Sequence, residues 1–237
     1  MKDKDFNFSD VLGYGWRTMK ANFWFFAGVG FLWAIITYTP AIANALFQRL
    51  PFGAPAHAGF NIITTIAGQI INIILSIGLI KIALAFCDGQ RPAVGTLFAA
   101  CGCFWRYLAT MILYCLIVFA GLVLLIVPGL IWAIKFSLGF YFVVDKGLDP
   151  VAALKASSRT TMGVKWQLFG FGIVCAFINM LGLICLLVGM FATYPTVLVA
   201  FALVYRQLLA QTPELAEFGI AGPGPQIESV SLPGQPE

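Results

Sequence analysis

Six long apolar runs constrain this chain more than any other feature of its sequence. Crossing a hydrocarbon layer about 30 Å thick takes roughly 20 helical residues, and four of the runs reach that length, while the fourth and sixth are shorter. The runs are continuously apolar, whereas membrane strands alternate polar and apolar residues. The sequence therefore predicts an all-α, polytopic transmembrane helical bundle with spans at Phe23–Phe47, Phe60–Phe86, Trp105–Val127, Leu130–Val144, Trp166–Val188 and Ala192–Leu209.

Composition supports the same protein class. Of the 237 residues, 60% are hydrophobic and 10% are charged, whereas a soluble domain has about 25% charged residues. Such a chain has too little polar surface to cover a water-soluble globule. The net charge of +4 does not indicate a nucleic-acid partner, because the cations stand singly between apolar runs and form no dense patch.

The placement of the cations predicts the orientation in the membrane. Cations precede the first span, flank the second and fourth connections, and lie near the end of the sixth span; the opposite side carries only Arg49 and His57. The positive-inside rule then places both termini in the cytoplasm, in a cytoplasmic (inner) membrane. A cleaved leader ending within Thr39–Ala45 would exceed the usual 15–30 residues or so of a signal peptide. The basic residues expected at the cytoplasmic interface include Arg17, Lys20, Arg106, Lys155, Arg159 and Lys165.

Amphipathic stretches precede the first, third and fifth spans, and they suggest a repeated unit. Apolar residues recur in them at spacings of three, four, seven and eleven, which is one face of a helix. A tryptophan (Trp24, Trp105 or Trp166) follows each stretch where the chain enters the next span, at the depth that indoles prefer. We expect three hairpins, each preceded by an interfacial helix, in pseudo-repeats 8–59, 92–129 and 149–211. The alternative is that these are ordinary amphipathic linkers.

The C-terminal segment differs from the rest of the chain. Residues 212–237 are rich in Pro, Gly and Glu and contain no Lys or Arg. A segment of this composition buries too little apolar surface to fold alone. The prediction is a membrane domain over 1–211 and a disordered tail over 212–237.

Residues typical of catalysis or metal binding are sparse. The single histidine, His57, has no second histidine or carboxylate beside it in sequence, so neither a metal site nor a catalytic triad is indicated. The six cysteines lie in or beside apolar helices, where cysteine acts as a small hydrophobic residue. We therefore expect a non-enzymatic protein without a metal or cofactor.

Lys135 is the most unusual charge, because it lies inside the fourth span about ten residues from Asp145. A lysine at this depth costs on the order of 3 kcal/mol on insertion scales. Three outcomes are open: its ammonium reaches the outer interface, it is held by polar side chains and helix carbonyls, or it faces a cavity and attracts an anionic group such as a lipid phosphate.

A polar stripe on the second span could accompany Lys135. Asn61, Thr65, Gln69, Asn72 and Ser76 recur at spacings of four, four, three and four, along one helix face. Stripes of this kind hydrogen-bond between helices, and polar residues of the first and fifth spans extend the network. The functional alternative is a polar intramembrane pocket with Lys135 as its fixed charge. Thr37, Asn44 and Gln48 are the partners in the first span, and the candidate anion site comprises Lys135, Gln69, Asn72, Ser76 and Asn179.

One stretch carries a family resemblance. A Pro-Gly pair, a lysine seven positions after the proline and the run "SLGFYFVVDKGLDPVAALKASSRTTMG" resemble the membrane domain attached to some bacterial glycerophosphoryl diester phosphodiesterases, and related six-span inner-membrane proteins of unknown function. The resemblance implies a bacterial cytoplasmic membrane location and supplies no reaction. It covers about 36 residues, with matches at Pro128, Gly129, Lys135, Asp145, Gly147, Pro150, Ala153, Leu154, Ser157, Thr161 and Gly163.

Two functional hypotheses follow. The first is a membrane-organising or accessory protein, whose cytoplasmic-side helices rest on anionic lipid or on a membrane-protein partner, because cations near the inner leaflet gain about 1 kcal/mol each from headgroups. The second is a transporter or binding protein for an anionic lipid or small solute, acting through a polar pocket around Lys135. A polar cavity reaching the bilayer midplane favours the second, and a closed core favours the first.

Overall fold

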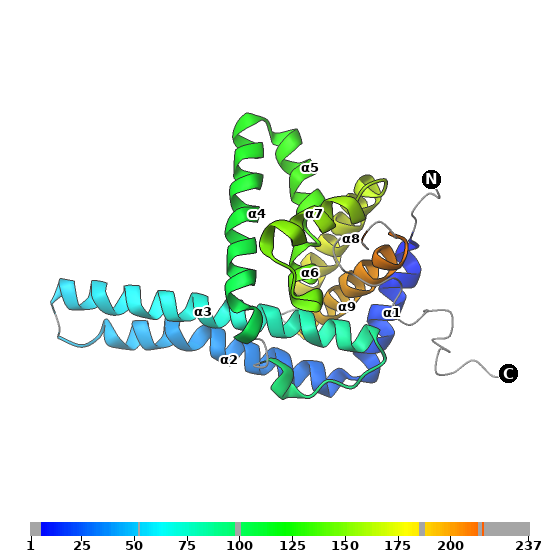
Figure 1. Cartoon of the computed structure of the whole chain (residues 1–237). Coiled ribbons are helices and arrows are strands. Elements are labelled where there is room, and N and C mark those ends of the chain that lie inside the picture. The colour runs from blue at the N-terminus through cyan, green and yellow to red at the C-terminus, as the bar shows by residue number, and fades with distance from the viewer. Residues whose placement is uncertain (1–5, 52, 98–100, 185–187, 213–214, 216–237) are drawn as a thin grey trace.

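The computed structural model describes residues 6–51, 53–97, 101–184, 188–212 and 215, and within these ranges the chain forms helices and no strand (Figure 1). Six of its helical stretches are long and apolar enough to cross a membrane. The predicted all-α, six-span class is therefore confirmed. The tail predicted over 212–237 lies outside the described residues except for Thr212 and Leu215, which are both buried.

The predicted pseudo-repeats 8–59 and 92–129 both end inside a hairpin, so we use the word repeat for the whole predicted hairpin unit; the first contains α1 (Phe8–Ala21), α2 (Phe23–Phe47) and α3 (Ala54–Cys87). The bounds of α2 are those predicted from the apolar run. However, α3 begins six residues earlier than predicted, so His57 lies on a helix rather than in a loop. Pro55 in the first turn of α3 explains the difference, because proline is preorganised for the start of a helix.

The second repeat departs most from the prediction. It contains the 3₁₀ turns η1 (Val94–Leu97) and η2 (Cys101–Cys103), then α4 (Phe104–Leu124), α5 (Ile126–Phe136) and α6 (Gly139–Lys146). The prediction of an amphipathic helix at its start is thus wrong for the described residues, which form two short 3₁₀ turns there. Gly95 and Gly102 lie in these turns, and glycine disfavours a continuous helix.

Two details of the α4–α6 hairpin also differ from the prediction. The turn lies at the extended residue Leu125 rather than at Pro128-Gly129. Pro128 instead belongs to α5, and Gly129 packs closely against Gly121 of α4. The fourth span, expected to be continuous, is interrupted at Ser137–Leu138 between α5 and α6.

The third repeat contains α7 (Pro150–Thr160), α8 (Lys165–Ile184) and α9 (Val188–Ala210). Asp149 occupies the N-cap position of α7 and Pro150 its first position, where proline is preorganised for a helix. Gly163, between α7 and α8, has a φ of +93°, which an L-residue with a side chain rarely adopts. The chain therefore turns here at a glycine.

The core lies where α1, α6, α9 and the C-terminal half of α3 meet (Figure 1). Its largest fully buried side chains include Ile82, Phe142 and Tyr205. The apolar face of α1 packs on α9, and that of α7 packs on α4, α5 and α6. The buried faces of α1 and α7 are thus covered by the protein itself, whereas Trp16 on α1 and Val151 on α7 are exposed.

A hydrogen bond also ties α1 to α3. The hydroxyl of Tyr14 donates to the carbonyl oxygen of Phe86 at 3.0 Å. Burial raises the pKa of Tyr14 above its ordinary value, which further favours the protonated form that donates this hydrogen bond. The amino-terminal helix is thereby fixed to the same end of α3 that enters the core.

Beyond the core, the α2/α3 and α4/α5 hairpins project in different directions (Figure 1). Their outer surfaces are apolar, with Phe31, Ile63, Phe119 and Val123 each 64–69% exposed. Exposed apolar surface of this extent requires a lipid or protein environment. Helices that cross one bilayer lie within about 40° of its normal. We therefore expect the two hairpins to lie closer to parallel in a membrane than in Figure 1.

Candidate functional site

An ionic cluster joins the C-terminal ends of α3, α6 and α9, which end the three even-numbered spans. The guanidinium of Arg206 on α9 donates from Nη1 to Asp145 Oδ2 of α6 at 2.8 Å, and from Nη2 to Asp88 Oδ2 at the end of α3 at 2.6 Å. We call Arg206, Asp145, Asp88 and Tyr205 the Arg206 cluster. Through these ion pairs the side chain of Arg206 on α9 bridges α6 and the end of α3.

Burial makes the Arg206 cluster energetically important. The side chains of Asp145 and Arg206 are 12% and 17% exposed, and the Tyr205 hydroxyl donates to Asp145 Oδ2 at 2.9 Å. Tyr205 also stacks on Tyr141 with ring centroids 5.4 Å apart. A buried charge that loses its partner pays a large desolvation penalty. The cluster is therefore expected to fix how the three repeats meet.

Local sequence patterns did not identify this cluster. Asp145 and Arg206 are 61 residues apart, and neither belongs to a motif that specifies a partner. A usable signal was present, however: Asp88, Asp145 and Arg206 each lie at the same end of an even-numbered span. Opposite charges at equivalent ends of three hairpins are candidates for pairing once the spans are known.

A second polar contact lies at the break in the fourth span. The carbonyl oxygen of Lys135 accepts from Ser157 Oγ at 2.9 Å and from Thr161 Oγ1 at 3.2 Å, while Tyr114 donates to the carbonyl of Ala133 at 3.1 Å. The last carbonyls of a helix lack intrahelical partners. Hydroxyls from α4 and α7 supply them here, which explains how a span can be interrupted inside the protein.

The ammonium of Lys135 has a different environment from its carbonyl. Its Nζ lies 5.3 Å from the ring centroid of Phe136, a cation–π geometry. Lys135 is partly buried on the last turn of α5. Three outcomes were considered for this lysine. The structure shows an aromatic contact for its side chain and a structural role for its backbone carbonyl.

Removing the two hydroxyls is expected to reveal that they share one acceptor. Ser157→Ala or Thr161→Val alone should lower the free energy of unfolding by about 1 kcal/mol, because the remaining hydroxyl still caps the Lys135 carbonyl. The double variant should lose more than the sum, because a buried carbonyl is left unpaired. Unfolding in detergent measures all three, and additive losses would contradict shared capping.

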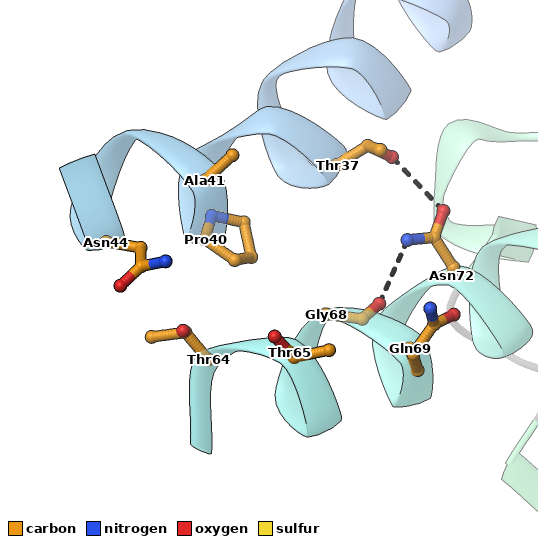
Figure 2. A pocket seen from close by; sticks show the side chains of 9 residues that line it. All are labelled: Thr37, Pro40, Ala41, Asn44, Thr64, Thr65, Gly68, Gln69 and Asn72. Carbon is orange, nitrogen blue, oxygen red and sulfur yellow. Dashed lines mark hydrogen bonds between the residues drawn. The ribbon is translucent and has the colours of Figure 1, made fainter. Parts of the chain in front are cut away.

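A pocket of about 260 Å³ lies between α2 and α3. All nine of its lining residues belong to these two helices, and Figure 2 shows the side chains of both helices converging on it. Thr37 Oγ1 donates to Asn72 Oδ1 at 3.3 Å, and Asn72 Nδ2 donates to the carbonyl of Gly68 at 3.0 Å. The predicted hydrogen bonding between the polar stripe and the first span is thus confirmed for Thr37 and Asn72.

The structure separates the members of the candidate anion site. Gln69 and Asn72 line the pocket, and Ser76 donates to the carbonyl of Asn72 one turn away at 2.8 Å. Lys135 lies on α5 and Asn179 on α8, and neither is among the lining residues. The arrangement expected around Lys135 is therefore replaced by an uncharged pocket and a separate lysine.

The basic residues expected at the cytoplasmic interface differ in their surroundings. Arg106 is exposed but engaged with the protein, because its Nη1 donates to the carbonyl of Gly147 at 2.8 Å and its Nε lies 3.6 Å from Asp149. Arg17, Lys20 and Lys155 are exposed. Arg159 and Lys165 are partly exposed.

The three tryptophans that begin the odd-numbered spans all point outward. Trp24, Trp105 and Trp166 are 85%, 77% and 76% exposed. On the surface of α1, Lys20 Nζ lies 5.0 Å from the ring centroid of Trp16. Aromatic and basic side chains therefore lie together where α1 leads into α2, a combination typical of a membrane–water interface.

The described residues hold no group of three or more His, Cys, Asp or Glu side chains placed to bind a metal. The described cysteines Cys87, Cys103, Cys115 and Cys175 are unpaired thiols. Chemically, the arrangement offers ion pairing at the Arg206 cluster, hydrogen bonding to uncharged groups in the α2/α3 pocket, and a basic, aromatic surface along α1.

Comparison with known proteins gives one similarity. The chain is 31% identical over 100 residues to a UPF0259 membrane protein of Pectobacterium carotovorum, an alignment covering 42% of this chain and 40% of the relative. The aligned part thus spans about two fifths of that protein. No family model and no solved structure matches, and the resemblance to the phosphodiesterase-associated domain stays a prediction. With its six apolar helices and this similarity, the chain is a multi-pass membrane protein.

Proposed function

We propose that the chain is a non-enzymatic accessory protein of the bacterial cytoplasmic membrane, with both termini in the cytoplasm, and that it gathers anionic lipid at its inner face. The observation that carries the proposal is the exposed set of Trp16, Arg17, Lys20 and Trp24 where α1 meets α2. Indoles favour the depth of the headgroups, and each nearby cation gains about 1 kcal/mol from anionic lipid.

The covered apolar faces of α1 and α7 refine this proposal. Because one face of α1 packs on α9, we assign the proposed lipid contact to its exposed basic and aromatic side chains. Arg106 contributes less, because it is already engaged with Gly147 and Asp149. Lys155 on α7 belongs to the same proposed inner surface.

The experiment is lipid retention by variants that lose charge on α1. Arg17→Gln with Lys20→Gln should weaken phosphatidylglycerol binding by roughly 2 kcal/mol in all, at about 1 kcal/mol for each cation. Native mass spectrometry of protein released from mixed phosphatidylglycerol and phosphatidylcholine nanodiscs measures the retained lipid. High salt should reduce the difference, because exposed charges are screened.

The matched control is Arg49→Gln, which removes one exposed cation from the opposite end of α2. It should leave phosphatidylglycerol retention unchanged, because the proposed lipid surface is at the α1 end. Equal loss in the Arg49 variant, or unchanged retention in the Arg17 and Lys20 double variant, would contradict the proposed function.

A further inference from the structure

The α2/α3 pocket is chemically distinctive because all its polar groups are uncharged. Hydroxyls come from Thr37, Thr64 and Thr65, and carboxamides come from Asn44, Gln69 and Asn72 (Figure 2). Hydroxyls and carboxamides both donate and accept hydrogen bonds. Such a lining suits a neutral ligand with hydroxyl or carbonyl groups, whereas a phosphate would meet no cation in it.

Some of this hydrogen-bonding capacity is unused. Asn44 Oδ1 is buried and has no hydrogen-bond partner among the described residues. Pro40 lines the pocket from inside α2 and lacks an N–H, so the carbonyl of Ile36 loses its helical donor. Buried polar atoms in proteins are nearly always paired. The pocket therefore offers at least one unpaired acceptor, Asn44 Oδ1, to a donor from outside the chain.

The surroundings of the pocket show which ligands can reach it. The outer faces of the two helices carry Ile35, Ile42, Ile62 and Ile66, which are 49%, 58%, 61% and 56% exposed. Such a surface faces acyl chains in a membrane. A ligand arriving through this layer must itself be lipid-soluble, with a polar end for the pocket and an apolar part for the isoleucines.

The depth of the α2/α3 pocket in the membrane and its volume narrow the class of ligand further. Asn72 and Thr65 lie 15 and 22 residues before Cys87, or about 22 and 33 Å along the helix at 1.5 Å per residue. In the orientation of the proposed function, on which this step rests, the pocket runs from the outer third to the outer edge of a layer about 30 Å thick, and lipids carry their glycerol and ester groups at that edge. A volume of about 260 Å³ admits the polar end only, because pockets for whole drug-sized ligands start near 300 Å³.

We infer that the α2/α3 pocket binds the neutral, hydroxyl-bearing end of a lipid of the diacylglycerol class. The hydroxyl donates to Asn44 Oδ1, and an ester carbonyl accepts from the carboxamide of Gln69. The acyl chains lie along the exposed isoleucines. This site is separate from the basic surface on α1.

Photolabelling tests the inference. Dioleoylglycerol carrying a diazirine near the ester end of one chain is added to the full chain in phosphatidylcholine nanodiscs, and the labelled peptides are mapped. We expect label on α2 and α3, and an at least tenfold loss of that label in both Asn44→Leu and Gln69→Leu. The matched control is Asn179→Leu, which removes a span carboxamide outside the pocket and should leave the label unchanged.

Two competitors define the ligand class on the wild-type chain, so that these outcomes do not depend on a variant folding. Unlabelled dioleoylglycerol should displace the probe, whereas dioleoylphosphatidate, with the same chains and a phosphate in place of the hydroxyl, should not. Displacement by phosphatidate would overturn the neutral class, and displacement by free glycerol would overturn a lipid ligand. Label that is spread evenly over all helices would overturn the site. None of these outcomes alters phosphatidylglycerol retention by Arg17 and Lys20, so the two proposals fail separately.

Discussion

Replacing Arg206 with methionine is expected to lower the free energy of unfolding by about 3–5 kcal/mol, the cost of breaking a buried ion pair from one side. The variant leaves Asp145 buried, at 12% exposure, without its guanidinium partner. It also frees the end of α3, because Asp88 loses its contact at 2.6 Å. Unfolding by a denaturing detergent in mixed micelles, followed by circular dichroism, measures the loss.

Two further variants distinguish the stabilisation that comes from the two ion pairs of Arg206 from the effect of its positive charge alone. Arg206→Lys should recover only part of the stability, because an ammonium cannot reach both carboxylates with the planar geometry of a guanidinium. Lys146→Met should cost at most about 1 kcal/mol, as for an exposed pair, because Lys146 lies 3.4 Å from Asp145 with a third of its side chain exposed. Equal losses for Arg206→Met and Lys146→Met would show that the bridge between repeats is not what stabilises the fold.

Gly15→Ala should lower the free energy of unfolding by about 1–3 kcal/mol, the usual cost of forcing an extra group into a packed contact. A Cβ at this position would collide with the backbone carbonyl oxygen of Thr196 on α9. Since backbone cannot rotate away as a side chain can, α1 must shift from α9. Limited proteolysis of α1 and thermal unfolding in detergent both report this change.

Gly13→Ala provides a control within the same helix. A Cβ there meets only the guanidinium of Arg17, at an ordinary distance of 3.6 Å. Replacing glycine by alanine in an open helical position stabilises the helix by roughly 0.5–1 kcal/mol. The two substitutions should thus have opposite signs, and a loss of stability in both would point to a requirement for flexibility in α1 instead of close packing.

The sequence predicts the helices well because length and apolarity are local properties. Phe23–Phe47 has the predicted bounds, and all six spans are present. The break at Ser137–Leu138 could not be predicted, because it depends on hydroxyls from α4 and α7 that cap the α5 carbonyls. The amphipathic faces of α1 and α7 were visible in the sequence. What covers them was not, since periodicity does not distinguish lipid from a neighbouring helix.

In the candidate sites too, contacts that follow from local spacing could be predicted, whereas contacts set by tertiary packing could not. The polar stripe and its contact with Thr37 follow from helical spacing in adjacent spans, and the structure brings Thr37 and Asn72 together. The grouping of Lys135 with Gln69 required knowledge of which hairpins lie side by side, and depth in the membrane gives no such information. The pairing of Arg206 with Asp145 is likewise set by tertiary packing between repeats.

Cysteine accessibility in intact cells tests the central claim, that the chain crosses the membrane six times with its basic connections inside. In a background without the six native cysteines, His57→Cys at the α2/α3 tip and Lys155→Cys on α7 are treated with an impermeant maleimide. We predict labelling of residue 57 from outside, and of residue 155 only after the membrane is permeabilised. Labelling of residue 155 in intact cells, or protection of residue 57, would contradict the six-span topology.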